Sequence, residues 1–203
     1  MARGSAPARL ALVLVLALVP GCLGGSPRPQ FFTLSPASGP GAGPALASLP
    51  DLGLVVGPLD LPRFLDRPEL VTRDGAYHLV VADAERWGGS LRSDILHGVA
   101  DGLSRLLGTA LVAVYPGEPR FSARYRILLD VRELDAVRGE KVTLRLRWTV
   151  ASLPDGRAVA VEESVIEQPV ASGSFEELVA AESAALGAAT RQIAERIAQL
   201  SAS

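Results

Sequence analysis

Cysteine and histidine are scarce in this sequence, and the shortage limits the chemistry that the protein can perform. Cys22 is the only thiol in 203 residues, so no disulfide can form within the chain and its stability must come from burial. A histidine-based zinc site would need carboxylates beside His78 and His97, the only two histidines. The P-loop, G-x-G-x-x-G, G-x-S-x-G and H-E-x-x-H motifs are all missing. We therefore expect a protein that is not an enzyme and needs no cofactor.

Basic residues are too few for a nucleic-acid-binding protein. The chain has 20 Lys and Arg against 22 Asp and Glu, and two of the arginines, Arg3 and Arg9, lie in the first nine residues. Without residues 1–21 the balance is 18 basic against 22 acidic side chains, a net charge of −4. Nucleic-acid binders carry a basic face and a high pI instead. We expect no nucleic-acid partner.

The sequence also lacks a long apolar run at its start. Residues 10–20 are apolar, but they make up roughly half of the ~20 residues that a transmembrane helix needs. Arg3 and Arg9 precede this run, and Gly21-Cys22 follows it, which is the layout of a bacterial lipoprotein signal. In such signals the cysteine thiol is diacylated, typically with palmitate, the chain is cut before it and the new amine is acylated. We expect residues 1–21 to be removed, and residues 22–30 to tether the protein to a membrane through Cys22.

The remaining residues, 31–203, are enough for one domain with its own core. Residues 35–50 hold four prolines and three glycines without a charge, so we expect an irregular connector there. A helix is predicted from Ser90, a plausible N-cap, to Gly108, and a second one from the capping box of Ser174 and Glu177 to the end of the chain.

Strands are predicted from apolar runs and from alternating patterns. Three segments alternate apolar and polar residues and are separated by short turns, as in antiparallel hairpins: 123–132, 142–150 and 158–168. Shorter strands are expected at 31–34, 52–57, 70–73, 77–82 and 110–114. The pattern indicates an α+β fold, with an antiparallel or mixed sheet and two amphipathic helices packed on one face.

Several charged side chains have two interpretations. The polar face of the sheet gathers arginines, which we expect to be an ordinary solvated face balanced by acids rather than a docking surface for anions. Glu182 falls within the apolar stripe of the last helix, so it should meet an arginine or lie at the exposed end of the stripe. His78 and His97 are expected to be inert. The arginines of the sheet face are Arg124, Arg126, Arg132, Arg145 and Arg147.

Residues 55–73 form the most distinctive stretch of the sequence. Pro58, Pro62 and Pro68 interrupt regular structure there, and Asp66 could brace the loop by an ion pair with Arg67. An Arg-Trp pair follows at positions 86 and 87. The prolines and charges of this stretch by themselves predict an ordered connector between two strands. As a binding surface it would present Leu61, Pro62, Phe64, Asp66, Arg67, Pro68, Leu70, Arg86 and Trp87.

The sequence resembles the PqiC/YmbA-like family of ABC-type transport auxiliary lipoproteins. Its members show an aromatic-aromatic-Thr-Leu-like strand after the lipidated cysteine, here residues 31–34. They also show a Leu-Pro-x-aromatic-Leu-Asp-Arg-Pro-x-Leu-Val-like loop, here residues 61–71, and an Arg-Trp before the first helix, here Arg86-Trp87. The resemblance covers nearly the whole chain after Cys22.

The resemblance implies a role in transport rather than a reaction. Such lipoproteins work with an ABC permease, its ATPase and a protein bearing MCE (mammalian-cell-entry-like) domains, and together they move lipids or other hydrophobic molecules across the cell envelope. Because Leu23 is not the Asp that commonly retains lipoproteins in the inner membrane, the resemblance favours the periplasmic face of the outer membrane. The residues leave open whether the chain forms a homo-oligomer.

Two other functions are compatible with the sequence. The protein could be a structural envelope lipoprotein that tethers other components and has no transport role. It could also be a small periplasmic hydrolase, which would require a serine or carboxylate within hydrogen-bond reach of His78 or His97.

Overall fold

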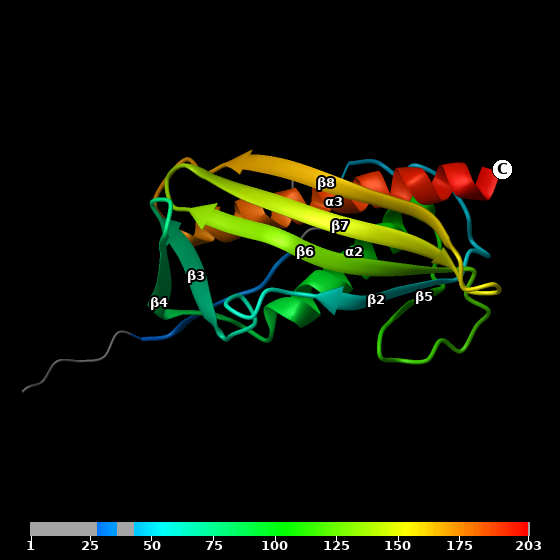
Figure 1. The fold of residues 1–203 in the computed structure, drawn as a ribbon, viewed down its shortest axis with the longest axis horizontal. Helices are drawn as coiled ribbons and strands as arrows, with labels where there is room; N and C mark the ends of the chain where they lie inside the picture. The colour runs from blue at the N-terminus through cyan, green and yellow to red at the C-terminus, as the bar shows by residue number, and fades with distance from the viewer. Residues whose placement is uncertain (1–27, 36–42, 203) are drawn as a thin grey trace, which may run out of the picture.

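The computed structural model describes residues 28–35 and 43–202, and places them in two sheets and two long helices (Figure 1). No helix of this described part is long and apolar enough to cross a membrane. The strands are β1 (Gln30–Phe32), β2 (Leu54–Asp60), β3 (Glu69–Asp74), β4 (His78–Trp87), β5 (Val112–Val114), β6 (Tyr125–Val137), β7 (Lys141–Ser152) and β8 (Ala158–Pro169), and the helices are α2 (Leu91–Leu107) and α3 (Phe175–Ala202).

The larger sheet has five strands in the order β5-β2-β6-β7-β8. Strands β6, β7 and β8 form an antiparallel meander, because they follow one another through the short turns that the sequence predicts. Strand β2 joins parallel to both β5 and β6, which makes the sheet mixed. The alternating pattern of β7 places Leu144, Leu146 and Trp148 on the buried face, and Trp148 Nε1 donates to Ser164 Oγ at 3.0 Å.

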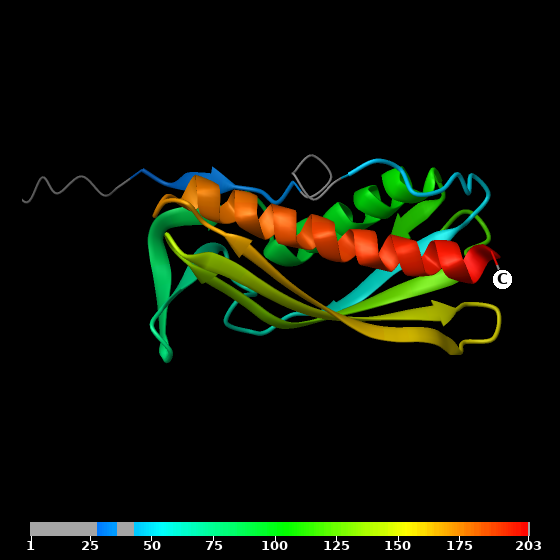
Figure 2. The ribbon, with the colours of Figure 1, turned by 90° about the horizontal axis from the view of Figure 1, so that it is seen from above.

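Both helices lie on the same side of the larger sheet (Figures 1 and 2). Ser90 caps α2 by accepting a hydrogen bond from Ser93 N, and Gly108 ends the helix in the left-handed conformation, as predicted. Gly102 lets the two helices approach closely, because a Cβ atom there would lie 2.7 Å from Thr190 Cγ2. The apolar faces of the helices and the sheet enclose one core. The predicted α+β architecture is confirmed.

The small sheet was not predicted as a separate unit. Strand β4 runs between β1, which is parallel to it, and β3, which is antiparallel. Three side chains from this region, Leu70, Ala82 and Trp87, are buried in the common core, so the small sheet closes one end of the domain. Figures 1 and 2 place the β3–β4 hairpin and the start of the described chain at that same end.

Candidate partner-binding site

The loop of residues 61–68 connects β2 to β3 and is divided into a buried half and an exposed half. Leu61 and Leu65 belong to the core, and Leu65 N and Asp66 N both donate to the carbonyl of Pro62. These contacts fold the loop into a tight turn whose leucines point inward. Three of the nine residues predicted for partner binding, Leu61, Leu70 and Trp87, are therefore structural, whereas Phe64, Asp66, Arg67 and Pro68 are exposed and Pro62 and Arg86 are half-buried.

Arg92, in the first turn of α2, fixes this loop to the rest of the domain. One of its guanidinium nitrogens donates to the carbonyl of Leu59, and another lies 2.8 Å from Asp66 Oδ2. Arg92 therefore connects both ends of the turn to α2, a role that the sequence gave no signal for.

The ion pair proposed between Asp66 and Arg67 is wrong. Arg67 Nε lies 2.9 Å from Glu69 Oε2, while Asp66 pairs with Arg92. Arg86 Nη2 also approaches Glu69, at 3.9 Å. The hydrogen bond from Arg67 is the main cause that lowers the pKa of Glu69, so this carboxylate is ionised between two guanidinium groups.

The exposed part of the loop presents an aromatic ring beside two cations. Phe64 is 40% exposed although it is a large apolar side chain, and Arg63 and Arg67 flank it along the chain. We call these three residues the loop surface. Because the loop is held by buried leucines and by Arg92, this surface needs little ordering when a partner binds, which lowers the entropic cost of binding.

A mostly apolar cleft of about 350 Å³ borders the loop on the side of Arg92. Leu59, Leu96, Val114 and Tyr115 provide much of its lining, and the Tyr115 ring is partly exposed at its rim. Gly57 allows this close approach of β2 and the segment after β5, because a Cβ atom there would lie 2.9 Å from Tyr115 Cβ. Arg92 lines this cleft and also binds Asp66, so the cleft lies next to the loop that carries the loop surface.

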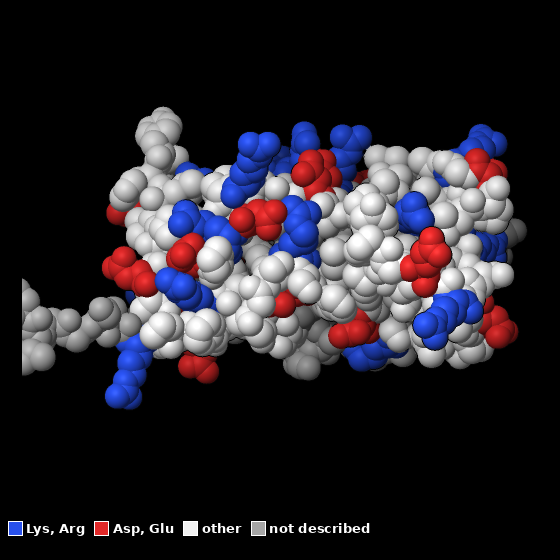
Figure 3. Space-filling model, turned by 90° about the horizontal axis from the view of Figure 1, so that it is seen from below, with Lys and Arg blue, Asp and Glu red and all other residues white. Residues whose placement is uncertain are grey.

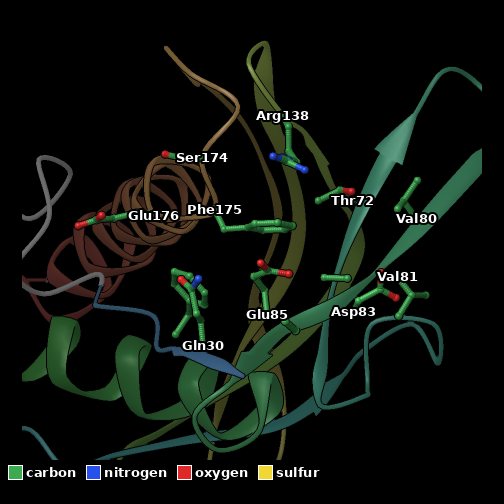
Figure 4. A pocket seen from close by; sticks show the side chains of 13 residues that line it. Gln30, Thr72, Val80, Val81, Asp83, Glu85, Arg138, Ser174, Phe175 and Glu176 are labelled. Carbon is green, nitrogen blue, oxygen red and sulfur yellow. The ribbon is translucent and has the colours of Figure 1, made fainter. Parts of the chain in front are cut away.

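A larger cavity, of about 640 Å³, lies at the end of the domain and was missed by the sequence reasoning (Figure 4). The Arg138 guanidinium lies 4.4 Å above the Phe175 ring and donates to Gly173 O at 2.7 Å. Figure 4 shows Glu85 below that ring, pointing into the cavity. The lining of this cavity includes three acidic side chains, Asp83, Glu85 and Glu176. Because Arg138 is the one basic side chain among the lining residues, the cavity does not suit an anion.

Two of the five arginines on the polar face of the larger sheet pair with acids, as expected for a solvated face. Arg145 lies 3.4 Å from both Glu133 and Glu163, and Arg132 lies 3.1 Å from Asp130. Figure 3, which shows another side of the molecule, also displays positive and negative side chains interspersed, with no broad field of one sign.

Glu182 does not make the ion pair that we expected. Its side chain is only 5% exposed, it pairs with no basic group in the described part of the chain, and its Oε2 has no hydrogen-bond partner. Burial raises the pKa of Glu182 from 4.5 to about 8. The carboxyl is therefore protonated at neutral pH, which avoids the cost of a buried charge.

The histidines have serine or carboxylate neighbours, but their geometry does not resemble a hydrolase triad. His97 Nδ1 lies 3.2 Å from Ser93 Oγ and 2.9 Å from the Ser93 carbonyl, one turn away on an exposed helix face. An Nδ1–H that donates to the carbonyl cannot accept the serine proton. His78 lies 3.8 Å from Asp74 at an exposed hairpin. Among the described residues, no group of three or more His, Cys, Asp or Glu side chains could hold a metal ion.

Comparisons with solved structures agree on the fold. A crystal structure of an uncharacterized protein superposes with a TM-score of 0.67 at 16% identity, covering 84% of this chain and 99% of its own. Protein XCC0632 from Xanthomonas campestris superposes with a TM-score of 0.61 at 20% identity, covering 74% of this chain and 90% of its own. A search of curated proteins found no match.

The sequence itself identifies the family. The model of a family described as the ABC-type transport auxiliary lipoprotein component matches residues 32–194. The match runs from β1 through the loop and both sheets to the last turns of α3, so it covers the elements that hold the loop surface in place. The chain belongs to this family of ABC-type transport auxiliary lipoproteins.

Proposed function

We propose that this protein is a lipid-anchored component of an MCE-type ABC transport system on the periplasmic face of the outer membrane. In this role it performs no reaction and assists the movement of lipids or other hydrophobic molecules across the envelope. The family match over residues 32–194 carries the proposal, together with the cysteine that ends the apolar run at residues 10–20. ATP hydrolysis would belong to a separate ATPase subunit, which agrees with the missing P-loop.

The loop surface is the proposed contact with the MCE-domain protein or the permease. Phe64 is a partly exposed aromatic side chain with guanidinium groups on either side, and aromatic and arginine side chains dominate the energetics of protein interfaces. A partner with an apolar pocket rimmed by carboxylates would be complementary to it. The apolar cleft beside Arg92 lies next to the loop and would accept a second apolar side chain.

The test is co-purification of the partners from membranes with a Phe64→Asp, Arg67→Glu variant. We expect the MCE-domain protein to be lost from the eluate, because the variant removes the aromatic anchor and reverses one charge while the buried leucines stay in place. Arg157→Glu is the matched control, since Arg157 is exposed in the β7–β8 turn and the same charge is reversed there. Wild-type recovery of the partner by a folded loop variant would show that the contact lies elsewhere.

Lipidation at Cys22 gives a second prediction. Wild-type protein should incorporate labelled palmitate and band with outer membranes in a density gradient, whereas Cys22→Ser should carry no label, because no other thiol exists in the chain. A Cys22→Ser, Ser26→Cys variant is the control, since it restores a thiol outside the signal and should stay unlabelled. Labelling of Cys22→Ser would contradict the assigned site.

A structural lipoprotein without a transport role is the alternative. The two roles differ in the genes expected nearby, because permease, ATPase and MCE genes beside this one would support transport. Their absence, together with co-purification of unrelated envelope proteins only, would favour the structural role.

A further inference from the structure

The two most exposed large apolar side chains in the described part of the chain are both aromatic. Tyr77 is 99% exposed and Phe31 is 67% exposed, whereas no other such side chain exceeds 54%. Tyr77 lies in the turn between β3 and β4, and Phe31 lies on β1. We call these two residues the end surface.

Single exposed apolar residues are common, but these two aromatic side chains belong to one small sheet and lie at the two ends of β4, since Phe31 pairs with Arg86 and Tyr77 precedes His78. Strand β1 pairs with β4, so the end surface is formed by neighbouring strands and the turn that joins two of them. In both ribbon views this sheet lies at the end of the molecule where the described chain begins (Figures 1 and 2). Neither side chain belongs to the core, so the two contribute little to folding.

The position of the lipid anchor determines which end of the domain lies close to the membrane. Cys22 precedes Arg28, the first described residue, by six positions, and a fully extended chain of that length spans at most about 20–22 Å. With acyl chains on Cys22 inserted in the bilayer, Arg28 must stay within that distance of the headgroups. The β7–β8 turn lies at the opposite end of the sheet, beyond the reach of this short tether (Figure 1).

The charges around the end surface are of both signs. Asp74 and His78 flank Tyr77 and lie 3.8 Å apart, and Arg28 and Asp83 are exposed beside β1 and β4. Such a surface does not select a strongly acidic or basic protein. Aromatic rings bordered by polar groups are instead typical of the membrane–water interface, where one part of the ring is in contact with lipid and another with water.

We propose that the end surface, Phe31 and Tyr77, rests on the lipid bilayer to which Cys22 anchors the protein. This inference depends on the lipid anchor of the proposed function, and adds to it a second contact that fixes the orientation of the domain. The β7–β8 turn then points away from the membrane, and the small sheet faces it.

The test uses the fact that acylation would consume the only native thiol. Tyr77→Cys and Phe31→Cys, each labelled with an environment-sensitive fluorophore, are compared with Val161→Cys, an exposed position on β8 near the opposite end. The acylated full-length proteins are reconstituted in vesicles of phosphatidylethanolamine and phosphatidylglycerol, with and without lipids that carry a nitroxide quencher near the headgroup. We expect the labels at positions 77 and 31 to lose most of their emission, and the label at 161 to lose almost none.

The outcomes separate this inference from the proposed anchor. If all three proteins float with the vesicles and position 77 is quenched no more than position 161, the end surface does not touch the bilayer and the inference fails. If bifunctional cross-linking joins position 77 of two copies while quenching stays low, the surface is a self-association interface and the inference fails too. If the proteins do not float at all, the lipid anchor itself is contradicted.

Discussion

Replacing Glu182 by leucine is expected to stabilise the protein by about 2–4 kcal/mol at pH 8, because the substitution removes a buried carboxyl that pairs with none of the described residues. The residue is 5% exposed, and its Oε2 receives no hydrogen bond from residues 28–35 or 43–202. Leucine is apolar and of similar length, so it fills much of the same space in the core. The free energy of unfolding in urea, measured for both proteins at the same pH, checks this value.

The stability difference between the two proteins should depend on pH in one direction. The folded protein holds a proton on Glu182 up to about pH 8, whereas the unfolded chain releases it near pH 4.5. Unfolding therefore releases a proton between these values, and the contribution of Glu182 to stability falls as pH rises from about 4.5 to about 8. The whole change is about 3–5 kcal/mol, and above the folded-state pKa it levels off.

Other carboxylates also titrate, so the comparison must isolate Glu182. Glu195→Leu is the matched control, because Glu195 is exposed on the same helix. Its unfolding free energy should stay within about 0.5 kcal/mol of wild type and follow the same pH profile. If the Glu182→Leu and wild-type profiles run parallel from pH 5 to pH 8, an unrecognised partner compensates the charge of Glu182.

Gly57→Ala is expected to destabilise the protein by about 2–4 kcal/mol through backbone strain and crowding together. The φ angle of Gly57 is +108°, a conformation that side-chain-bearing residues rarely adopt. A Cβ atom there would also lie 2.9 Å from Tyr115 Cβ, which cannot move without its backbone. Tyr115 N donates to Val56 O beside this position, so the strain would weaken the contact between β2 and the segment after β5.

The Gly75→Ala variant separates the effect of backbone strain from the effect of crowding. Gly75 has a φ of +71°, and a Cβ atom at that position would meet nothing within 4 Å. The Gly75→Ala substitution should therefore lower the free energy of unfolding by only about 1 kcal/mol, which is the cost of the backbone conformation alone. Denaturation midpoints of the two alanine variants provide the comparison. Equal losses of stability in the two variants would mean that a shift of the segment after β5 relieves the crowding at Tyr115.

Much of the fold was predictable because its patterns are local. The alternation along β6, β7 and β8 and the short turns between them indicated an antiparallel meander, since period-2 burial and turn chemistry act over a few residues. The caps of α2 at Ser90 and Gly108 were visible for the same reason. The separate small sheet was not, because the pairing of β1 with β4 joins residues more than fifty positions apart.

The loop was predictable from the sequence as an ordered connector between two strands, but its contacts were not. The sequence of residues 61–71 drew attention to this loop because it resembles a motif of the family. The structure shows that the leucines of the loop are buried and that Arg63, Phe64 and Arg67 are exposed. The partners of Asp66 and Arg67 were assigned wrongly, because neighbours in sequence were assumed to pair. Arg92 and Glu69 are brought to the loop by α2 and β3 respectively.

The sequence by itself determined the family, the α+β class and the expectation of a lipid anchor at Cys22, because motifs, periodicity and composition are properties of the chain alone. Only the tertiary structure decided that Glu182 lies buried without a partner among the residues that the structure describes, that Arg92 holds the loop, and that Phe31 and Tyr77 remain exposed at one end. Burial and pairing depend on which distant segments pack together. The residues next to a position in the sequence therefore do not determine them.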